Sequence, residues 1–193
     1  MKLIGLTGGI GSGKSVVAAL LNFYGIPVYN SDTRSKELCV TNASLIAGLK
    51  QLLGAEVYLP NGVLNKSYMA KAIFSDAELM KASNQLIHPY VINDFNAWAN
   101  RQKAAIVIHE SALIIDASLG HLFESIICVT APESLRIERV CSRDGLSIEQ
   151  VKNRIKNQLS DQERIAHAHY VVINDGFNPL IPQVEILLKS LRS

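Results

Sequence analysis

The stretch Gly8-Gly9-Ile10-Gly11-Ser12-Gly13-Lys14-Ser15 decides the fold of this chain, because it has the spacing G-x-x-x-x-G-K-[ST] of a phosphate-binding loop. It directly follows the apolar run Lys2–Leu6 and opens a helical pattern over Lys14–Tyr24, so strand, loop and helix come in the required order. The glycines let backbone N–H groups approach a phosphate, and the following helix directs its positive N-terminus at the same anion. The sequence therefore predicts a nucleoside triphosphate site, in preference to a plain glycine-rich turn.

Each residue type in this loop has an expected task. Lys14 should reach the β and γ phosphates, and the Ser15 hydroxyl should bind Mg²⁺. The residues expected to contact the nucleotide within the loop are Gly9, Gly11, Ser12, Gly13, Lys14, Ser15 and Val16. GTPases usually carry N-K-x-D for guanine, and the sequence contains no such tetrapeptide.

Outward from the loop, short apolar runs alternate with helical patterns. The expected strands are Lys2–Leu6, Ile26–Tyr29, Ala105–His109, Ser125–Thr130 and Tyr170–Ile173. The expected helices are Lys14–Tyr24, Asp76–Arg101, Glu133–Arg143, Ile148–Leu159 and Leu180–Leu191. Runs with apolar residues at successive positions suit strands that are covered on both faces, as in parallel sheets. We therefore predict an α/β fold: a three-layer P-loop core with a mostly parallel five-stranded sheet.

The 193 residues are predicted to form a single P-loop domain in three parts. The core comprises residues 1–33 and 102–193. Residues 34–101 are largely helical and contain no strong strand, so we expect a helical insertion for a second substrate, in which Pro89 should kink or break a helix. Residues 139–150 form a short lid, within which Ser147 and Gln150 have the spacing of a capping box.

The composition excludes some classes of protein. Hydrophobic residues make up 48% and charged residues 19%, which fits a packed globular protein and excludes disorder as the main state. A net charge of +2 does not argue for a nucleic acid or an anionic membrane as partner. Three widely spaced cysteines suggest neither a disulfide framework nor a zinc site, and no apolar run is long enough to span a bilayer. We expect a soluble cytoplasmic protein, whose oligomeric state the sequence leaves open.

Asp32 is a candidate functional carboxylate outside the loop. It lies just past the second expected strand, at the carboxyl edge where α/β sheets place their ligands. It could accept a hydroxyl proton or help to hold the metal, or it could cap a helix that begins near Thr33. The residues alone leave both interpretations open.

Three arginines, Arg136, Arg139 and Arg143, share one face of an expected helix. Planar guanidinium groups suit a γ-phosphate whose charge spreads over three oxygens during transfer, and Arg139 and Arg143 are nearest the lid. A solvated basic face is the alternative. Other basic residues, Arg164 among them, alternate with acids and are interpreted as surface, and His88 beside Pro89 is interpreted as a structural histidine.

Four segments in order resemble the dephospho-CoA kinase family. They are IGLTGGIGSGKS at 4–15, NGVLNKSYMAKAIFSD at 61–76 followed by LIHPYV, RIERVCSRDGLSIEQVKNRIKNQ at 136–158, and YVVINDG at 170–176. The resemblance implies a nucleoside-monophosphate-kinase-like core with a helical CoA-side insertion and a lid. It implies that ATP, with Mg²⁺, donates its γ-phosphate to the ribose 3′-hydroxyl of dephospho-CoA, giving coenzyme A and ADP in the last step of coenzyme A biosynthesis.

The same resemblance implies roles for single residues. Lys14, Asp32 and Arg139 would be catalytic, with Asp32 the candidate base for the 3′-hydroxyl. Arg143 would contact the phosphates, and Asn174 would lie by the adenine. The acceptor would be bound by Asp32, Lys66, His88 and Asp116.

The chain departs from the family pattern at several of these places. Asn30-Ser31-Asp32 replaces the usual Asp-x-Asp, Lys66 replaces an arginine, and Asp116 replaces the glutamate of Pro-Leu-Leu-Phe-Glu. Two alternatives stay open on the sequence: a P-loop kinase for another small-molecule acceptor, and a non-catalytic nucleotide switch.

Overall fold

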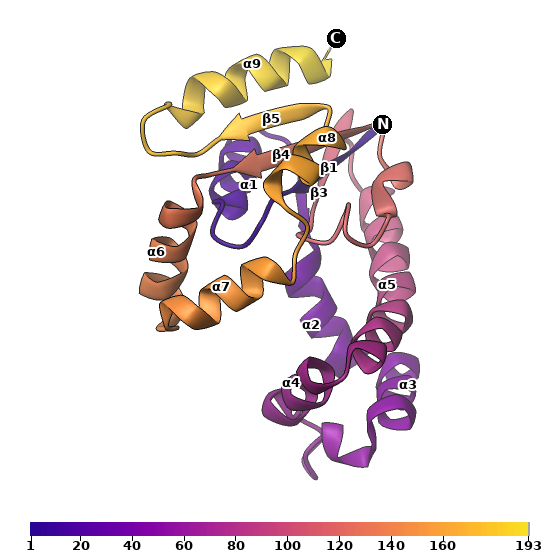
Figure 1. Ribbon diagram of the computed structural model, residues 1–193. Helices are drawn as coiled ribbons and strands as arrows, with labels where there is room; N and C mark the ends of the chain where they lie inside the picture. Colours follow the sequence, from indigo (N-terminus) through magenta and orange to yellow (C-terminus); the bar gives the residue numbers. More distant parts are fainter. Residues whose placement is uncertain (193) are drawn as a thin grey trace. The chain divides into compact units, whose positions relative to one another are not determined.

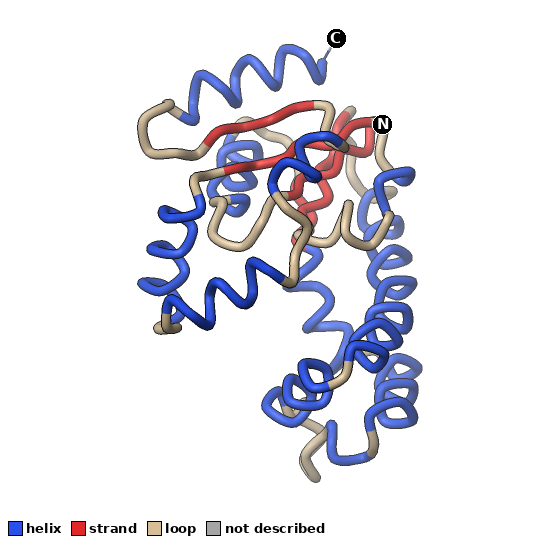
Figure 2. The backbone as a smooth tube through the Cα atoms, viewed as in Figure 1, coloured by secondary structure: helices blue, strands red, loops and turns tan. Residues whose placement is uncertain are grey.

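The structure is a computed structural model that describes residues 1–192 (Figure 1). The chain forms two compact units. One comprises residues 1–30 and the chain from Gln102 onward, and the other comprises Ser31–Arg101. All the strands lie in the first unit, whereas the second is helical (Figure 2).

The first unit is built on a five-stranded sheet in which every pairing is parallel. Its strands are β1 (Lys2–Thr7), β2 (Val28–Asn30), β3 (Ile106–Glu110), β4 (Ser125–Thr130) and β5 (Tyr170–Ile173). The spatial order is β2-β3-β1-β4-β5. The prediction of an α/β fold with five strands is confirmed. Because β1 is central, the phosphate-binding loop leaves the sheet at its middle, between the ends of β3 and β4.

Helices follow the strands of this unit. They are α1 (Lys14–Phe23), α6 (Glu133–Asp144), α7 (Ile148–Lys156), α8 (Asp161–Ala166) and α9 (Leu180–Arg192), with a short 3₁₀ helix η2 at Leu119–Leu122. Helices α1 and α9 cover one face of the sheet, where the core includes Leu6, Leu21, Ile127 and Leu188. On the other face, Ile114 packs against Gly5 so closely that an added Cβ would lie 3.0 Å from its Cδ1. The strands β1, β3 and β4 are thus buried on both faces, which explains their unbroken apolar sequences, whereas Val171 and Ile173 of the edge strand β5 are exposed.

In the region of the predicted lid, the chain turns after α6 and again after α7. Helix α6 ends at Asp144, followed by Gly145 in the left-handed conformation, and the expected capping box between Ser147 and Gln150 starts α7. The predicted helix to Leu159 is too long, because α7 stops at Lys156. A second capping box, formed by Ser160 and Glu163, starts the separate helix α8, which periodicity did not reveal.

The second unit consists of α2 (Ser31–Thr41), α3 (Ala43–Leu53), η1 (Ala55–Val57), α4 (Lys66–Ser75) and α5 (Ala77–Ala99). Arg34 of α2 donates to both carboxylate oxygens of Asp94 on α5, at 2.9 and 2.8 Å, and so joins the two helices. The sequence predicted that Pro89 should kink or break a helix. Helix α5 continues through Pro89, so the prediction of a break is wrong. Its buried residues Val91 and Phe95 keep the second half packed, and this packing offsets the cost of a proline inside the helix.

Two further findings concern the chain as a whole. Cys39, Cys128 and Cys141 are free thiols. Among the described residues 1–192, no helix has the length and apolar character needed to cross a membrane.

Candidate active site

The loop between β1 and α1 has the backbone of a phosphate cradle. Gly11 and Gly13 take left-handed φ values of 77° and 89°, which residues with a side chain adopt only with strain. A Cβ on Gly11 would also lie 2.5 Å from the backbone oxygen of Arg136. Helix α1 begins directly after Gly13, so the first N–H groups of the helix, which have no partner within it, face the loop.

Side chains from remote parts of the first unit hold the loop by its peptide groups. Arg136, which is buried, donates from Nε to the backbone oxygen of Ile10 at 2.9 Å. Gln158 accepts from the backbone N–H of Ile10 at 3.0 Å. Arg136 was one of three arginines grouped as a phosphate-facing or solvated basic face. The structure gives it a third role, as a buried support of the loop.

Two predicted site residues hold the next two peptide groups. Arg139 donates to the backbone oxygen of Gly11 at 3.4 Å. The side-chain amide of Asn174 donates to the backbone oxygen of Ser12 at 2.9 Å. Arg139 also donates to the side-chain oxygen of Asn174 at 3.3 Å. Three loop carbonyls, those of Ile10, Gly11 and Ser12, thus accept from side chains outside the loop. The N–H groups at the end of the loop and in the first turn of α1 can then bind an anion.

Lys14 and Ser15 converge on a carboxylate that the sequence analysis missed, Glu110 at the end of β3. The Lys14 ammonium lies 3.6 Å from Glu110 Oε1, and the Ser15 hydroxyl donates to the same oxygen at 3.2 Å. The side-chain amide of Asn30 donates to the other oxygen at 2.7 Å. Glu110 is only 4% exposed, and these donors offset the cost of burying its charge.

The signal for Glu110 was present in the sequence. An acid that directly follows an apolar strand, beside the strand that leads into a phosphate-binding loop, marks the metal side of many such sites. The predicted third strand ended at His109, one residue too early, so Glu110 was left out. Its hydroxyl neighbour Ser15 and its own carboxylate are oxygen donors of the kind that Mg²⁺ prefers.

The residues present therefore fit Mg²⁺ held jointly by protein and nucleotide. Within residues 1–192 there is no cluster of three or more His, Cys, Asp or Glu side chains placed to hold a metal ion. Mg²⁺ usually keeps several waters and binds through one or two protein oxygens together with substrate phosphates, which matches Ser15 and Glu110 beside the loop.

Arg143 faces its own neighbour. Its guanidinium donates to both oxygens of Asp144, at 2.7 and 2.9 Å, and its side chain is 64% exposed. This hydrogen-bonded ion pair lowers the pKa of the Asp144 carboxyl. Arg143 therefore lies on a solvated face, which was the alternative interpretation of these arginines. Arg136 and Arg139 of the same helix contact the loop.

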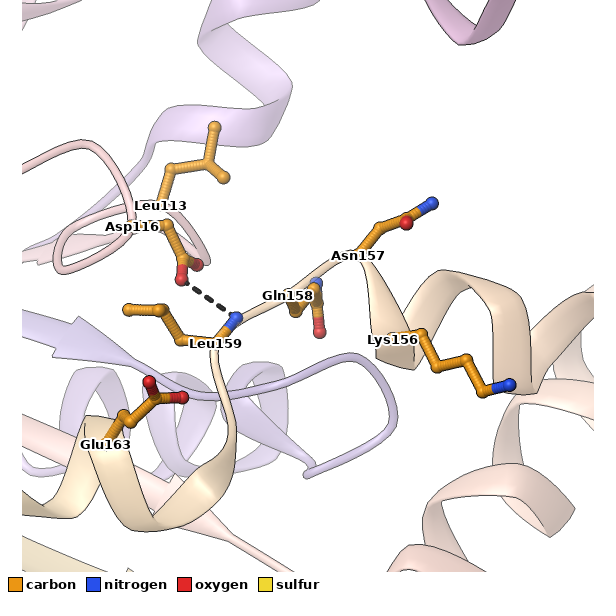
Figure 3. A pocket seen from close by; sticks show the side chains of 7 residues that line it. All are labelled: Leu113, Asp116, Lys156, Asn157, Gln158, Leu159 and Glu163. Atoms are coloured by element: carbon orange, nitrogen blue, oxygen red, sulfur yellow. Dashed lines mark hydrogen bonds between the residues drawn. The ribbon is translucent and has the colours of Figure 1, made fainter. Parts of the chain in front are cut away.

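Asp116 lines a cavity of about 390 Å³ between the end of α7 and the start of α8. Figure 3 shows its carboxylate directed at the backbone N–H of Leu159, to which the distance is 3.2 Å. The same carboxylate pairs with Arg164 at 3.2 Å. Arg164 is fully buried, so interpreting it as a surface residue was wrong. The other polar residues that line the cavity are Lys156, Asn157, Gln158 and Glu163.

The remaining predicted residues lie in the helical unit, each on a different helix. Asp32 is exposed in the first turn of α2, and because that helix begins at Ser31, Asp32 is not its N-cap. Lys66 is exposed at the start of α4. His88 is half-buried in the middle of α5, and burial lowers its pKa.

Comparison with known proteins agrees with this geometry. A model of the dephospho-CoA kinase family matches residues 2–179. The chain belongs to the dephospho-CoA kinase family. It is 42% identical to the dephospho-CoA kinase of Bacteroides fragilis, over 97% of this chain and 92% of that protein. It is 39% identical to the dephospho-CoA kinase of Porphyromonas gingivalis, over 100% of this chain and 96% of that protein.

A solved structure agrees as well. The crystal structure of TT1252 from Thermus thermophilus superposes with a TM-score of 0.84 at 31% identity, covering 99% of this chain and 96% of that one. Family membership makes the chain an enzyme, a kinase that phosphorylates dephospho-CoA with ATP. This decides against the two alternatives, another small-molecule acceptor and a non-catalytic switch.

Proposed function

We propose that the loop of the first unit holds ATP with Mg²⁺, and that the γ-phosphate passes to the ribose 3′-hydroxyl of dephospho-CoA. The observation that supports this most is the convergence of Lys14 and Ser15 on Glu110 beside the loop. In that arrangement an ammonium, a hydroxyl and a carboxylate are placed to meet a phosphate and its metal ion. The products are coenzyme A and ADP, and we expect the reaction to take place in the cytoplasm, in keeping with three free thiols.

In the proposed mechanism Lys14 moves from Glu110 to the β and γ phosphates when ATP binds. Ser15 and Glu110 would hold Mg²⁺, which when bound neutralises charge on the β and γ phosphates. Arg139, which already contacts the loop at Gly11, would stabilise the charge on the transferred group. Gly9, Gly11, Ser12, Gly13 and Val16 complete the phosphate contacts, Arg143 would join them from the lid, and Asn174 would lie between the loop and the adenine.

On the acceptor side we propose Asp32 as the base. The 3′-hydroxyl oxygen forms a bond to the γ-phosphorus, the bond from that phosphorus to the β–γ bridging oxygen breaks, and the hydroxyl proton passes to the Asp32 carboxylate. Lys66, His88 and Asp116 would bind the acceptor. Because burial lowers the pKa of His88, its imidazole is neutral at pH 7 and would act as a hydrogen-bonding group.

The test is ADP release with ATP and Mg²⁺, comparing dephospho-CoA with shikimate, gluconate and nucleoside monophosphates. Rapid release with dephospho-CoA alone, and a product heavier by one phosphate, is the expected result. Equal release without any acceptor would contradict the proposal.

The role of Asp32 needs its own experiment. Asp32→Asn should lower kcat more than it raises KM for dephospho-CoA, since a base acts mainly in the transition state. Glu78→Gln, an acid-to-amide change at an exposed position of α5, is the matched control. A change in KM alone would limit Asp32 to substrate positioning.

A further inference from the structure

Asn30 and Glu110 form a pair across two neighbouring strands. They are the last residues of β2 and β3, and they lie opposite each other in the parallel register. The Asn30 side chain donates from Nδ2 to Glu110 Oε2 at 2.7 Å. Lys14 and Ser15 use only Oε1, so the two oxygens of one carboxylate have different partners.

This division orients the carboxylate. A glutamate side chain has three rotatable bonds, so its carboxylate can take several directions unless contacts fix it. Glu110 is almost fully buried, so its protein partners set the direction of its carboxylate. The amide of Asn30 holds one oxygen on the side of β2. The other oxygen, Oε1, then lies 3.2 Å from the hydroxyl oxygen of Ser15. At that distance the carboxylate and the hydroxyl can bind the same metal ion.

The identity of residue 30 follows from that of residue 110. An amide can donate a hydrogen bond to a carboxylate, whereas an ionised carboxylate can only accept one. An aspartate at position 30 would place two negative groups at hydrogen-bond distance in a buried place, where they repel strongly. One carboxylate and one amide satisfy each other at these two positions, whereas two carboxylates would have to share a proton or a cation.

We propose that Asn30 is a positioning residue, which fixes the Glu110 carboxylate for the metal ion of the ATP complex. This rests on the metal role proposed above for Ser15 and Glu110. On this basis the asparagine at position 30 does not remove a carboxylate from the site. Glu110 supplies the carboxylate from the neighbouring strand, and Asn30 orients it.

The experiment is a double-mutant cycle with Asn30→Asp, Glu110→Gln and the exchanged double variant N30D/E110Q. Calorimetry gives the affinity for ATP with and without Mg²⁺, and the electron paramagnetic resonance spectrum of Mn²⁺ reports its binding to the ADP complex. Asn22→Asp, the same change at an exposed position of α1, is the control for added charge. Asn30→Ala removes the amide without adding charge, and unfolding midpoints show whether each variant is folded.

Each single variant should lose about tenfold or more of the metal-dependent gain in ATP affinity, with metal-free affinity little changed, as for other residues that orient metal ligands. The exchanged variant should regain most of the loss, because it restores one carboxylate and one amide in contact. Asn30→Ala should lose affinity in the same direction, and Asn22→Asp should behave as the wild type.

Two results would overturn the proposal. One is a folded Asn30→Asp variant with unchanged metal-dependent affinity, and the other is an exchanged variant whose loss equals the sum of the two single losses. If the wild-type affinity for ATP did not depend on metal at all, the metal role of Ser15 and Glu110 would itself be refuted. The three failures are therefore distinguishable.

Discussion

The substitution Asp116→Asn tests the ion network under the cavity of Figure 3. Arg164 is 0% exposed and lies 3.2 Å from Asp116 and 3.5 Å from Asp161. Asp161 in turn pairs with the buried Arg136 at 2.8 Å. Two guanidinium groups and two carboxylates thus balance, and removing the charge of Asp116 leaves two cations for one anion.

The cost can be set from this geometry. Removing one partner of a buried ion pair costs about 3–5 kcal/mol, because an uncompensated charge stays behind. Asp161 still contacts Arg164, so the lower end applies, and we expect the free energy of unfolding to fall by about 3 kcal/mol. For a chain of 193 residues that corresponds to a decrease in Tm of roughly 6–12 °C.

Thermal and urea unfolding at pH 7 measure the loss. Asp144→Asn is the matched control, since it breaks the exposed pair with Arg143 and should leave the midpoint near that of the wild type. The double variant D116L/R164M replaces the whole pair by apolar side chains and should regain most of the stability. A loss below about 1 kcal/mol for Asp116→Asn, the range of surface pairs, would refute the argument from burial.

Three further predictions concern the site and the core beside it. Lys14→Ala should lower kcat by orders of magnitude in steady-state assays, with an unchanged circular dichroism spectrum, because its ammonium acts on the phosphates. Asn174→Leu should weaken ATP binding about tenfold by calorimetry, since the backbone oxygen of Ser12 loses its donor. Burial lowers the pKa of His109 from 6.5 to about 4, so between these values the unfolded chain takes up a proton that the folded chain does not. The contribution of His109 to the free energy of unfolding is therefore fully retained above pH 6.5 and falls by about 3 kcal/mol toward pH 4. Unfolding of the His109→Phe variant, followed across this pH range, should lack that fall.

Sequence patterns alone predicted the fold class and the phosphate site. The eight residues from Gly8 to Ser15 form a local structure, in which glycine conformations, the start of α1 and the preceding strand follow from neighbours in the chain. The capping box at Ser147 was predictable for the same reason, because its two hydrogen bonds span three residues. Parallel pairing followed less directly, from unbroken apolar runs that require cover on both faces, and the strand order was not predicted.

Tertiary structure alone decided the partners of the charged groups. Glu110 meets Ser15 and Asn30 because three strands end at one edge of the sheet in a particular register, and residues 80 or more positions apart become neighbours there. Arg164 has the same local pattern as an exposed arginine, yet it is buried because α8 packs against β4, and only that packing brings Asp116 to it. Burial and long-range pairing set the energy of a charge, and neither is a property of the neighbouring sequence.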